Sequence, residues 1–287
     1  MALFAAADAV GLKIQHMTVV PAAFRADSIT IAILLAISVA CARFRHIQLL
    51  PRIAEMTHMA AVFLIFTGLA VVASYLIVAW HRPLIDEALN AADRSIGFDW
   101  LSYYNWVLAH PLVNKFLRFG YDSLTLQIFI LLVFLNLSGR GARGWELLWL
   151  FMTSSTMCIV FSMFWQAAGA LGYYHIKTDM LYVQIFMDVY NGTLTKIDYP
   201  VQGIIQFPSF HMALGILLVY VTRGLPLLFI TFLELNILLI LSTLPIGGHY
   251  LVDLGGGAIV AALAIALISA AYARHETAQS GTPDGAR

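Results

Sequence analysis

Two short stretches of this sequence carry residues whose types and spacing could do chemistry. The first reads Phe-Pro-Ser-Phe-His and ends at His211, and the second reads Gly-Gly-His-Tyr-Leu-Val-Asp and holds His249 and Asp253. Each stretch lies where a polar segment meets a long apolar run, and one apolar hairpin separates them. That hairpin returns the second stretch to the membrane face of the first. We therefore expect the three side chains to meet at one lipid–water boundary.

The spacing of His249 and Asp253 is that of one helix face. Residues four apart lie one above the other on an α-helix, so the carboxylate can accept a hydrogen bond from one ring nitrogen. Such a bond fixes the tautomer and leaves the other nitrogen to act as nucleophile or base. An ionised carboxylate near the hydrocarbon is costly without a partner, which favours this pairing. The alternative is an interfacial histidine capped by a nearby aspartate.

The first stretch is typical of a helix start, because Ser209 is a good N-cap residue with an apolar run behind it. Free N–H groups at such a start favour phosphate oxygens, and His211 would lie beside them. Gly247 and Gly248 would let the backbone approach a ligand closely, or would simply form a turn. With both histidines at one face, one can attack phosphorus while the other protonates the leaving oxygen.

The composition predicts a membrane protein. Of the 287 residues, 61% are hydrophobic and 11% are charged, and the mean hydropathy is +0.83. Soluble domains are about 25% charged and roughly half apolar. The formal net charge of zero gives no indication of nucleic-acid binding. Cys41 and Cys158 fall inside apolar runs, which favours packing over a disulfide or a metal pair.

The apolar runs predict an all-α polytopic fold with six to seven transmembrane helices and interfacial amphipathic helices, since about 20 apolar residues cross a ~30 Å bilayer core. We expect an N-terminal interfacial segment (1–28), a single transmembrane catalytic domain (29–273) and a disordered cytoplasmic tail (274–287). The predicted spans are residues 29–42, 59–80, 124–137, 145–170, 209–221, 227–244 and 250–272.

Two connecting segments and one acidic residue interrupt this pattern. Residues 81–122 are amphipathic, residues 172–206 form a predicted polar loop, and Glu234 lies in the middle of a span. An acid at that depth indicates function by default, and a protonated glutamate bonding across helices is an equal alternative. Four aromatic residues suit helices lying at the headgroup level: Trp100, Tyr103, Tyr104 and Trp106.

Arginines in the short loops predict the orientation, because positive residues there mark the cytoplasmic side. The turns after alternate spans hold Arg43, Arg45, Arg52, Arg140, Arg143, Arg223 and Arg274. We therefore expect an integral protein of the cell (inner) membrane, with both histidine stretches on the extracytoplasmic face.

The Pro-Ser-x-His and His-x-x-x-Asp pair resembles the signature of the type 2 phosphatidic acid phosphatase superfamily, whose members are membrane lipid phosphatases and phosphotransferases. The resemblance implies that His249 is the nucleophile and forms a phosphohistidine, that Asp253 orients it, and that His211 is the general acid. It also implies a lipid phosphate or phospholipid substrate.

The residues of the two stretches resemble most closely those of the inositol phosphorylceramide synthase (inositolphosphotransferase)-like branch. Members of that branch transfer a headgroup phosphate between lipids. That branch is also similar in a Tyr-x-Ser-x-x-x-Gln pattern, here Tyr121, Ser123 and Gln127. Two cations of the phosphatase pattern are replaced: Thr243 stands in place of an arginine and Tyr75 in place of a lysine. Hydrolysis and transfer to an alcohol both remain open.

A phosphate site usually needs a cation beyond backbone amides. On the side of the histidines the sequence offers Arg82, Arg94, Lys115, Arg118, Lys177 and Lys196. We favour Arg118, which is close to Tyr121 in the sequence. The alternative is that Arg118 only anchors the protein at the lipid headgroups. The candidates for binding the substrate phosphate are therefore Ser209, Gly248, Arg118, Tyr121 and Gln127. We expect no metal and no cofactor, since no carboxylate cluster suited to magnesium is evident.

Two other classes of protein are suggested by parts of the sequence. A haem- or metal-binding membrane electron carrier is suggested by nine histidines, but all nine lie at the ends of spans or in loops rather than facing one another within them. A transporter would want broken helices or paired charges near the midplane, and Glu234 stands there alone. The phosphoester enzyme remains the favoured hypothesis.

The predicted orientation can be tested with accessibility tags. A tag placed within residues 172–206 should be reached from outside intact cells, and a tag after Arg274 only after the membrane is made permeable. The arginine distribution is the reason for this expectation. Reversed accessibility would place the chemistry on the cytoplasmic face.

Overall fold

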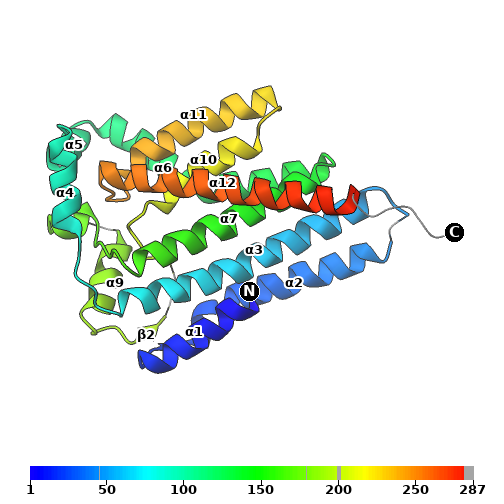
Figure 1. Cartoon of the computed structure of the whole chain (residues 1–287), viewed down its shortest axis with the longest axis horizontal. Helices are drawn as coiled ribbons and strands as arrows, with labels where there is room; N and C mark the ends of the chain where they lie inside the picture. Colours follow the sequence, from blue (N-terminus) through cyan, green and yellow to red (C-terminus); the bar gives the residue numbers. More distant parts are fainter. Residues whose placement is uncertain (45, 179, 199–201, 281–287) are drawn as a thin grey trace.

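The computed structural model describes residues 1–44, 46–178, 180–198 and 202–280, which are almost entirely helical (Figure 1). In chain order the elements are α1 (Ala2–Ile14), β1 (Thr18–Val19), η1 (Pro21–Phe24), α2 (Arg25–Ala42), α3 (Leu49–Val78), α4 (Asp86–Ser95), α5 (Trp100–Ala109), α6 (Pro111–Leu137), α7 (Gly141–Ser162), α8 (Ala170–Tyr173), α9 (Leu181–Tyr190), β2 (Lys196–Ile197), α10 (Phe210–Val221), α11 (Pro226–Thr243) and α12 (Leu251–Ser280).

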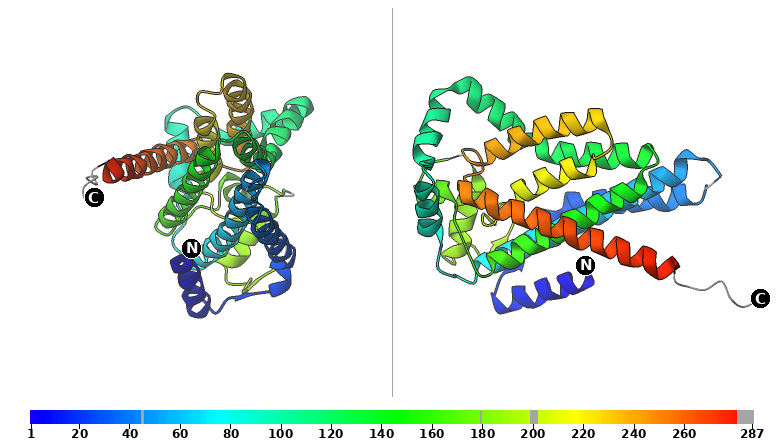
Figure 2. Two further views of the ribbon diagram at one scale, coloured as in Figure 1. Left: turned by 90° about the vertical axis from the view of Figure 1, so that its right-hand side faces the viewer. Right: turned by 45° about the horizontal axis from the view of Figure 1, so that its top comes forward.

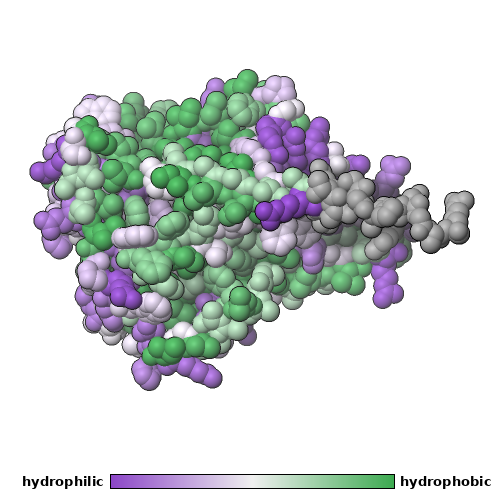
Figure 3. Space-filling model, in the orientation of Figure 1, coloured by the Kyte–Doolittle hydropathy of each residue, from purple (hydrophilic) through white to green (hydrophobic). Residues whose placement is uncertain are grey.

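Among the described residues, six helices are long and apolar enough to cross a membrane: α2 (with η1), α3, α6, α7, α11 and α12. Helix α10 is also apolar but has only 12 residues. The predicted all-α polytopic fold is confirmed. Helix α1 lies along the outside of the bundle against α3 (Figure 2), and the surface shows an apolar band between two polar ends (Figure 3).

Several predicted boundaries are wrong, because a helix can continue after its sequence stops being apolar. Helix α6 begins at Pro111 rather than at Leu124, with proline in its first turn where no N–H is needed. Helix α7 differs in the other direction at its end: it stops at Ser162, although the predicted span continues to residue 170. Helix α12 continues to Ser280, so the first residues of the predicted disordered tail are helical, while residues 281–287 lie outside the described part.

A cap of shorter elements covers one end of the bundle, where α4, α5, α9 and β2 gather (Figure 1). The predicted polar loop 172–206 is therefore wrong in part, since it contains α9. That helix buries Tyr182, Ile185, Phe186 and Val189 in one apolar cluster with residues of α3 and α5. Strands β1 and β2 pair in parallel within the cap, joining the N-terminal segment to the chain after α9.

Helix α10 is the centre of the bundle and contacts α6, α7, α11 and α12. Its residues Leu214, Leu217 and Leu218 are at most 1% exposed. Twelve residues give a helix of roughly 18 Å, much shorter than the ~30 Å hydrocarbon layer. The N-terminus of α10 therefore lies recessed beneath the cap, within the body of the protein.

At the opposite end, arginines tie the short loops together. Both carboxylate oxygens of Glu146 on α7 accept hydrogen bonds from Arg223, at 2.7 and 2.9 Å, and Arg143 donates to the carbonyl of Arg223. Arg223 also stacks on Tyr220, with 4.0 Å between the guanidinium carbon and the ring centroid. These arginines therefore fasten α7 to the α10–α11 turn. Arg45, which also entered the orientation prediction, lies outside the described residues.

The start of α12 is held by carboxylates from two elements. Asp93 on α4 accepts hydrogen bonds from the N–H groups of Leu251 and Val252, at 2.8 and 2.9 Å. Asp253 accepts from the N–H of Tyr250 at 3.0 Å, as the third residue of a helix does in a capping box. N–H groups at a helix start have no backbone partner within the helix. The two bonds to Asp93 therefore fix α12 to the cap, and the bond to Asp253 closes the first turn of α12 itself.

Replacing Asp93 with alanine should lower the stability of the protein, because two buried N–H groups would lose their acceptor. We expect a loss of about 1–3 kcal/mol. Asp93→Asn, which keeps one acceptor oxygen, should lose less, and Glu87→Ala on the exposed side of α4 should change nothing. Thermal unfolding of the purified protein in detergent measures all three. Equal melting temperatures for Asp93→Ala and Glu87→Ala would contradict this role.

Candidate active site

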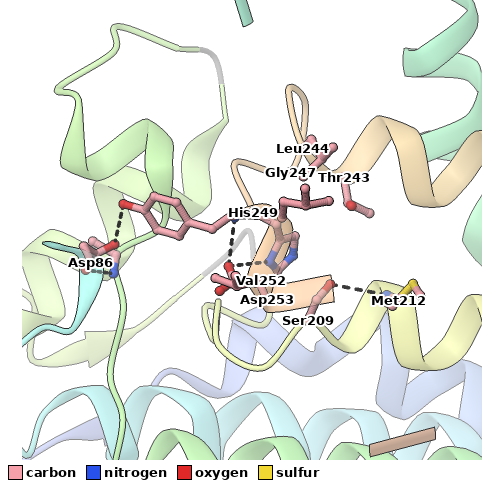
Figure 4. A network of polar contacts seen from close by, with 12 residues as sticks. Asp86, Ser209, Met212, Thr243, Leu244, Gly247, His249, Val252 and Asp253 are labelled. Atoms are coloured by element: carbon pink, nitrogen blue, oxygen red, sulfur yellow. Dashed lines mark hydrogen bonds and ion pairs between the residues drawn. The ribbon is translucent and has the colours of Figure 1, made fainter. Parts of the chain in front are cut away.

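His249 lies in the turn between α11 and α12, one residue before the N-cap of α12, and not on the helix itself as expected. Its backbone N–H donates to the carbonyl of Thr243 at 3.1 Å, and its side chain is buried. Its Nδ1 is 3.4 Å from Oδ2 of Asp253, and Figure 4 shows the ring beside that carboxylate. The structure thus brings the predicted pair together, although by a turn rather than by one helix face.

The contact between His249 and Asp253 is close but not yet a well-aligned hydrogen bond. Oδ2 of Asp253 already accepts from the N–H of Tyr250, and neither Nδ1 of His249 nor Oδ1 of Asp253 has a hydrogen-bond partner among the described residues. Catalytic hydrogen bonds are often long without substrate and tighten when it binds. A small rotation of either side chain would let Asp253 accept from Nδ1.

The surroundings keep the His249 imidazole neutral. Burial lowers its pKa to about 4, although a hydrogen bond with the backbone of Gln206 acts in the opposite direction. A group with this pKa carries no charge at neutral pH. The ring therefore has the lone pair that a nucleophile or a base requires.

His211 faces His249 from the first turn of α10. The two ring centroids are 5.7 Å apart at an interplanar angle of 65°. On its other side the His211 ring stacks on Tyr121 of α6, with 4.8 Å between centroids. Three elements thus bring the two histidines together, and a group bound between them could be touched by both rings.

The start of α10 presents backbone donors beside the histidines. Ser209 is the N-cap, and its hydroxyl accepts a hydrogen bond from the N–H of Met212 at 3.3 Å, as predicted (Figure 4). The N–H groups of Phe210 and His211 have no hydrogen-bond acceptor among the described residues. Free N–H groups at a helix start favour an anion. The start of α12, by contrast, is occupied by Asp93 and Asp253.

The turn that carries His249 is clamped from the cap. The indole N–H of Trp100 lies 3.0 Å from both the carbonyl of Leu244 and the carbonyl of His249. Trp100 is fully buried, stacked between Tyr104 and Tyr174. The prediction that Trp100 anchors at the headgroup level is therefore wrong, because its one donor is used to hold this turn.

Gly248 serves the same turn. Its φ is +66°, and a Cβ at this position would lie 2.4 Å from the hydroxyl of Tyr182. Its carbonyl accepts from the N–H of Ala170 at 2.7 Å, and Tyr182 donates to the carbonyl of Gly247 at 2.9 Å. The sequence predicted that a ligand could approach the backbone of Gly248 closely. In the structure, Tyr182 of the cap makes a close approach at this residue.

Gln127 lies deeper in the bundle than Tyr121 and is 2% exposed. Its amide nitrogen donates to Ser123 at 2.9 Å, and its amide oxygen accepts from Asn236 on α11 at 2.7 Å. This chain of side chains links α6 to α11 inside the membrane domain. The predicted Tyr-x-Ser-x-x-x-Gln residues therefore share one helix, but only Tyr121 contacts a catalytic candidate.

Two cations lie beside the catalytic turn, and neither stands at a position that is cationic in the phosphatase pattern. Tyr75 and Thr243, which stand where that pattern has lysine and arginine, are 1% and 0% exposed. Arg118 and Lys177 instead line a cavity of about 170 Å³ that also borders Pro245 and Ile246 of the catalytic turn. Arg82, another predicted candidate, is exposed and lies near Trp80.

Two buried aspartates of α4 were missed as site residues. Asp93 caps α12, and Asp86 accepts hydrogen bonds from the Tyr250 hydroxyl at 3.2 Å and the Ala168 N–H at 2.9 Å. Burial raises the pKa of Asp86 to about 6, while hydrogen bonds, first that from Ala168, act in the opposite direction. Their spacing of seven residues, which puts both acids on one face of a helix, is a signal that could have indicated burial.

The fold and the site define a class: a polytopic helical membrane protein with two facing histidines, one of them backed by an aspartate. The sequence model of the PAP2 superfamily matches residues 87–267, well over half of the chain. The chain therefore belongs to the PAP2 superfamily, and this membership supports a phosphatase- or phosphotransferase-type activity. No curated protein and no solved structure gives a significant match to the chain.

The clamp by Trp100 predicts a positioning role that can be separated from folding. Trp100→Phe keeps an aromatic ring between Tyr104 and Tyr174 but removes the donor. Because small displacements of a catalytic group cost up to 100-fold, we expect kcat to fall by roughly 10- to 100-fold. KM should change little, and the helical content should be retained. Trp106→Phe, on the exposed side of α5, is the matched control. Full activity in Trp100→Phe would exclude the clamp.

Proposed function

We propose that this protein transfers a phosphoryl group from a lipid phosphate or a phospholipid headgroup, through a covalent phosphohistidine at His249. The observation that carries the proposal is the arrangement of three side chains: His211 faces His249, and Asp253 lies behind the His249 ring. Membership of the PAP2 superfamily supports it. The apolar band of the surface is consistent with a substrate drawn from the membrane.

In the first step, the contact between the His249 ring and the backbone of Gln206 is released, and the neutral His249 attacks phosphorus through the nitrogen that does not face Asp253. The bond from phosphorus to the leaving oxygen breaks, and that oxygen takes a proton from His211. Burial lowers the pKa of His211 in the empty site, and the bound phosphate anion raises it so that the ring is protonated in the complex. His249 becomes positively charged as the new P–N bond forms. Asp253 then stabilises that charge and holds the ring, as the aspartate of a catalytic triad does.

In the second step, an acceptor attacks the phosphohistidine and restores His249. His211, now neutral, removes the proton from the acceptor oxygen as the new P–O bond forms. Water as acceptor gives a phosphatase, and a lipid or other alcohol gives a phosphotransferase. The resemblance to the inositol phosphorylceramide synthase-like branch favours transfer as strongly as the superfamily favours hydrolysis, so both products belong in the test.

Charge on the phosphate is met by donors on the α6 and α10 sides of the pair. We assign the N–H groups of Phe210 and His211 and the Ser209 hydroxyl, which keeps its own proton to donate, to the phosphate oxygens. Tyr121 and Arg118 complete this set from α6. Gln127 is assigned to positioning, because its side-chain amide is used within the protein. Gly248 is assigned to the phosphate through its N–H, since its carbonyl is the group that bonds within the described part of the chain.

We further propose that the site faces the extracytoplasmic side of the cell (inner) membrane and works without a metal ion. The short loops with arginines lie at the end opposite the cap, which supports this orientation. Among the described residues, no group of three or more His, Cys, Asp or Glu side chains is placed to hold a metal. The helix-end donors and Arg118 would carry the electrostatic work instead.

The three catalytic side chains should fail in different ways. His249→Ala should abolish turnover and the covalent intermediate. His211→Ala should lose several orders of magnitude with a natural phospholipid but recover partly with an aryl phosphate, whose leaving group needs no proton. Asp253→Asn should fold but turn over roughly 10⁴-fold more slowly, since an amide cannot stabilise imidazolium. All three variants are measured with labelled substrate, in parallel reactions with and without a chelator. An alkaline quench preserves phosphohistidine.

Each outcome has a contrary result. Normal labelling of His249→Ala, or phosphate found on His211, would reverse the two histidine roles. Loss of activity in the chelator, restored by added divalent ions, would make the three residues metal ligands. Ser209→Ala serves as a control that removes one donor and should retain the intermediate.

A further inference from the structure

Glu234 is a mid-span acidic residue that the proposed chemistry does not use. Helix α11 has 18 residues and Glu234 is the ninth, so it lies roughly 12–14 Å from either end. The side chain is exposed, and it forms no hydrogen bond or ion pair with the described residues. The predicted bond across helices is therefore not made within this part of the chain.

The outward face of α11 is regular. Leu227, Ile230, Ile237 and Leu241 are 47–81% exposed, and with Glu234 they follow steps of three and four residues. At 100° per residue these five positions fall within an arc of about 80°. The buried residues Phe232, Asn236 and Leu239 lie on the opposite side of the helix. Helix α11 itself lies at the edge of the bundle in both Figure 1 and Figure 2.

Lipid cannot satisfy this face. Hydrocarbon chains cover leucine and isoleucine as well as protein does, but they offer no hydrogen bond to a carboxyl group. An acidic side chain at the centre of a membrane helix is unfavourable and almost always faces protein or water. Something within the membrane that carries polar groups at the same depth is therefore expected to cover Glu234.

We propose that the stripe Leu227–Ile230–Glu234–Ile237–Leu241 is the interface with a second copy of this chain. A two-fold axis along the membrane normal brings equal depths of two α11 helices together, so Glu234 meets Glu234 of the second copy. A carboxylic acid both donates and accepts, and a pair of them satisfies itself. The alternation of three and four residues is that of a left-handed helix pair, in which these positions form the seam.

The second copy is favoured over a different protein by this self-complementarity. A foreign helix would have to bring a cation or a donor to the depth of Glu234, whereas a second copy brings the carboxyl group by symmetry. Leucine and isoleucine gain little by leaving lipid for protein, so the polar pair supplies the preference for association. The interface lies roughly 14 Å along α11 from Thr243. The proposed interface therefore does not depend on the histidine chemistry, and a failure of one proposal would leave the other unaffected.

The test uses full-length protein in lipid nanodiscs and in native membranes. Cysteines at Ile230 or Ile237, in a background with Cys41→Ser and Cys158→Ala, should form disulfide-linked dimers on mild oxidation. A cysteine at Ile259, exposed on α12, should not. Glu234→Leu should raise the dimer dissociation constant by roughly tenfold or more, the size of one interhelical hydrogen bond in a membrane. Thr231→Val, an exposed polar change on the same helix, should leave it unchanged.

Glu234→Gln separates the possible partners. Glutamine also donates and accepts without charge, so it should keep the dimer. Retained dimer in Glu234→Gln with loss in Glu234→Leu supports the second copy. Loss in both variants would indicate a cationic partner and overturn the proposal, as would wild-type protein that is monomeric by mass in nanodiscs with no cross-link at Ile230 or Ile237. Helical content and melting temperature confirm that each variant is folded.

Discussion

Backbone N–H groups at the start of a helix need acceptors wherever water is excluded, and this requirement organises the site. At α12 the acceptors are the carboxylates of Asp93 and Asp253, which together take the N–H groups of three consecutive residues. At α10, within the described part of the chain, only the third N–H has an acceptor, the Ser209 hydroxyl. One helix start is therefore closed by carboxylates and fixes the nucleophile candidate, while the other is left to meet an anion.

The acceptors required at the start of α12 are supplied by the layer of short elements that covers this end of the bundle. Asp93 and Asp86 reach α12 and its flanking turn only because α4 lies across the end of the bundle. Trp100 adds a donor for the carbonyls of the turn that precedes α12. Helix α10 is too short to cross the hydrocarbon layer, and the cap covers the end of the bundle at which α10 begins. The shortness of α10 and the depth of the cap together keep the histidines away from bulk water.

The electrostatics of this member of the superfamily differ from the phosphatase pattern in one respect. Thr243 and Tyr75 occupy the places of two expected cations, and both are buried scaffold residues. Arg118 and Lys177 reach the catalytic turn from α6 and from the segment before α9. Positive charge thus borders the catalytic turn at Pro245 and Ile246. His249 itself is neutral, which suits a nucleophile that becomes positive only in the reaction.

The sequence by itself determined the membrane class, the helical content and the convergence of His211, His249 and Asp253, because apolar run length and hairpin connectivity are local properties. Ser209 as N-cap was likewise predictable from its neighbours. Only the tertiary structure decided that His249 lies in a turn, that Trp100 is buried rather than interfacial, that Asp86 and Asp93 belong to the site and that Glu234 faces outward. Each of these depends on which distant element supplies a partner, α4 for α12 and α5 for the turn. Local sequence does not indicate which distant element will be the partner. The same amphipathic pattern is compatible with a helix lying at the headgroups and with a helix folded over an active site.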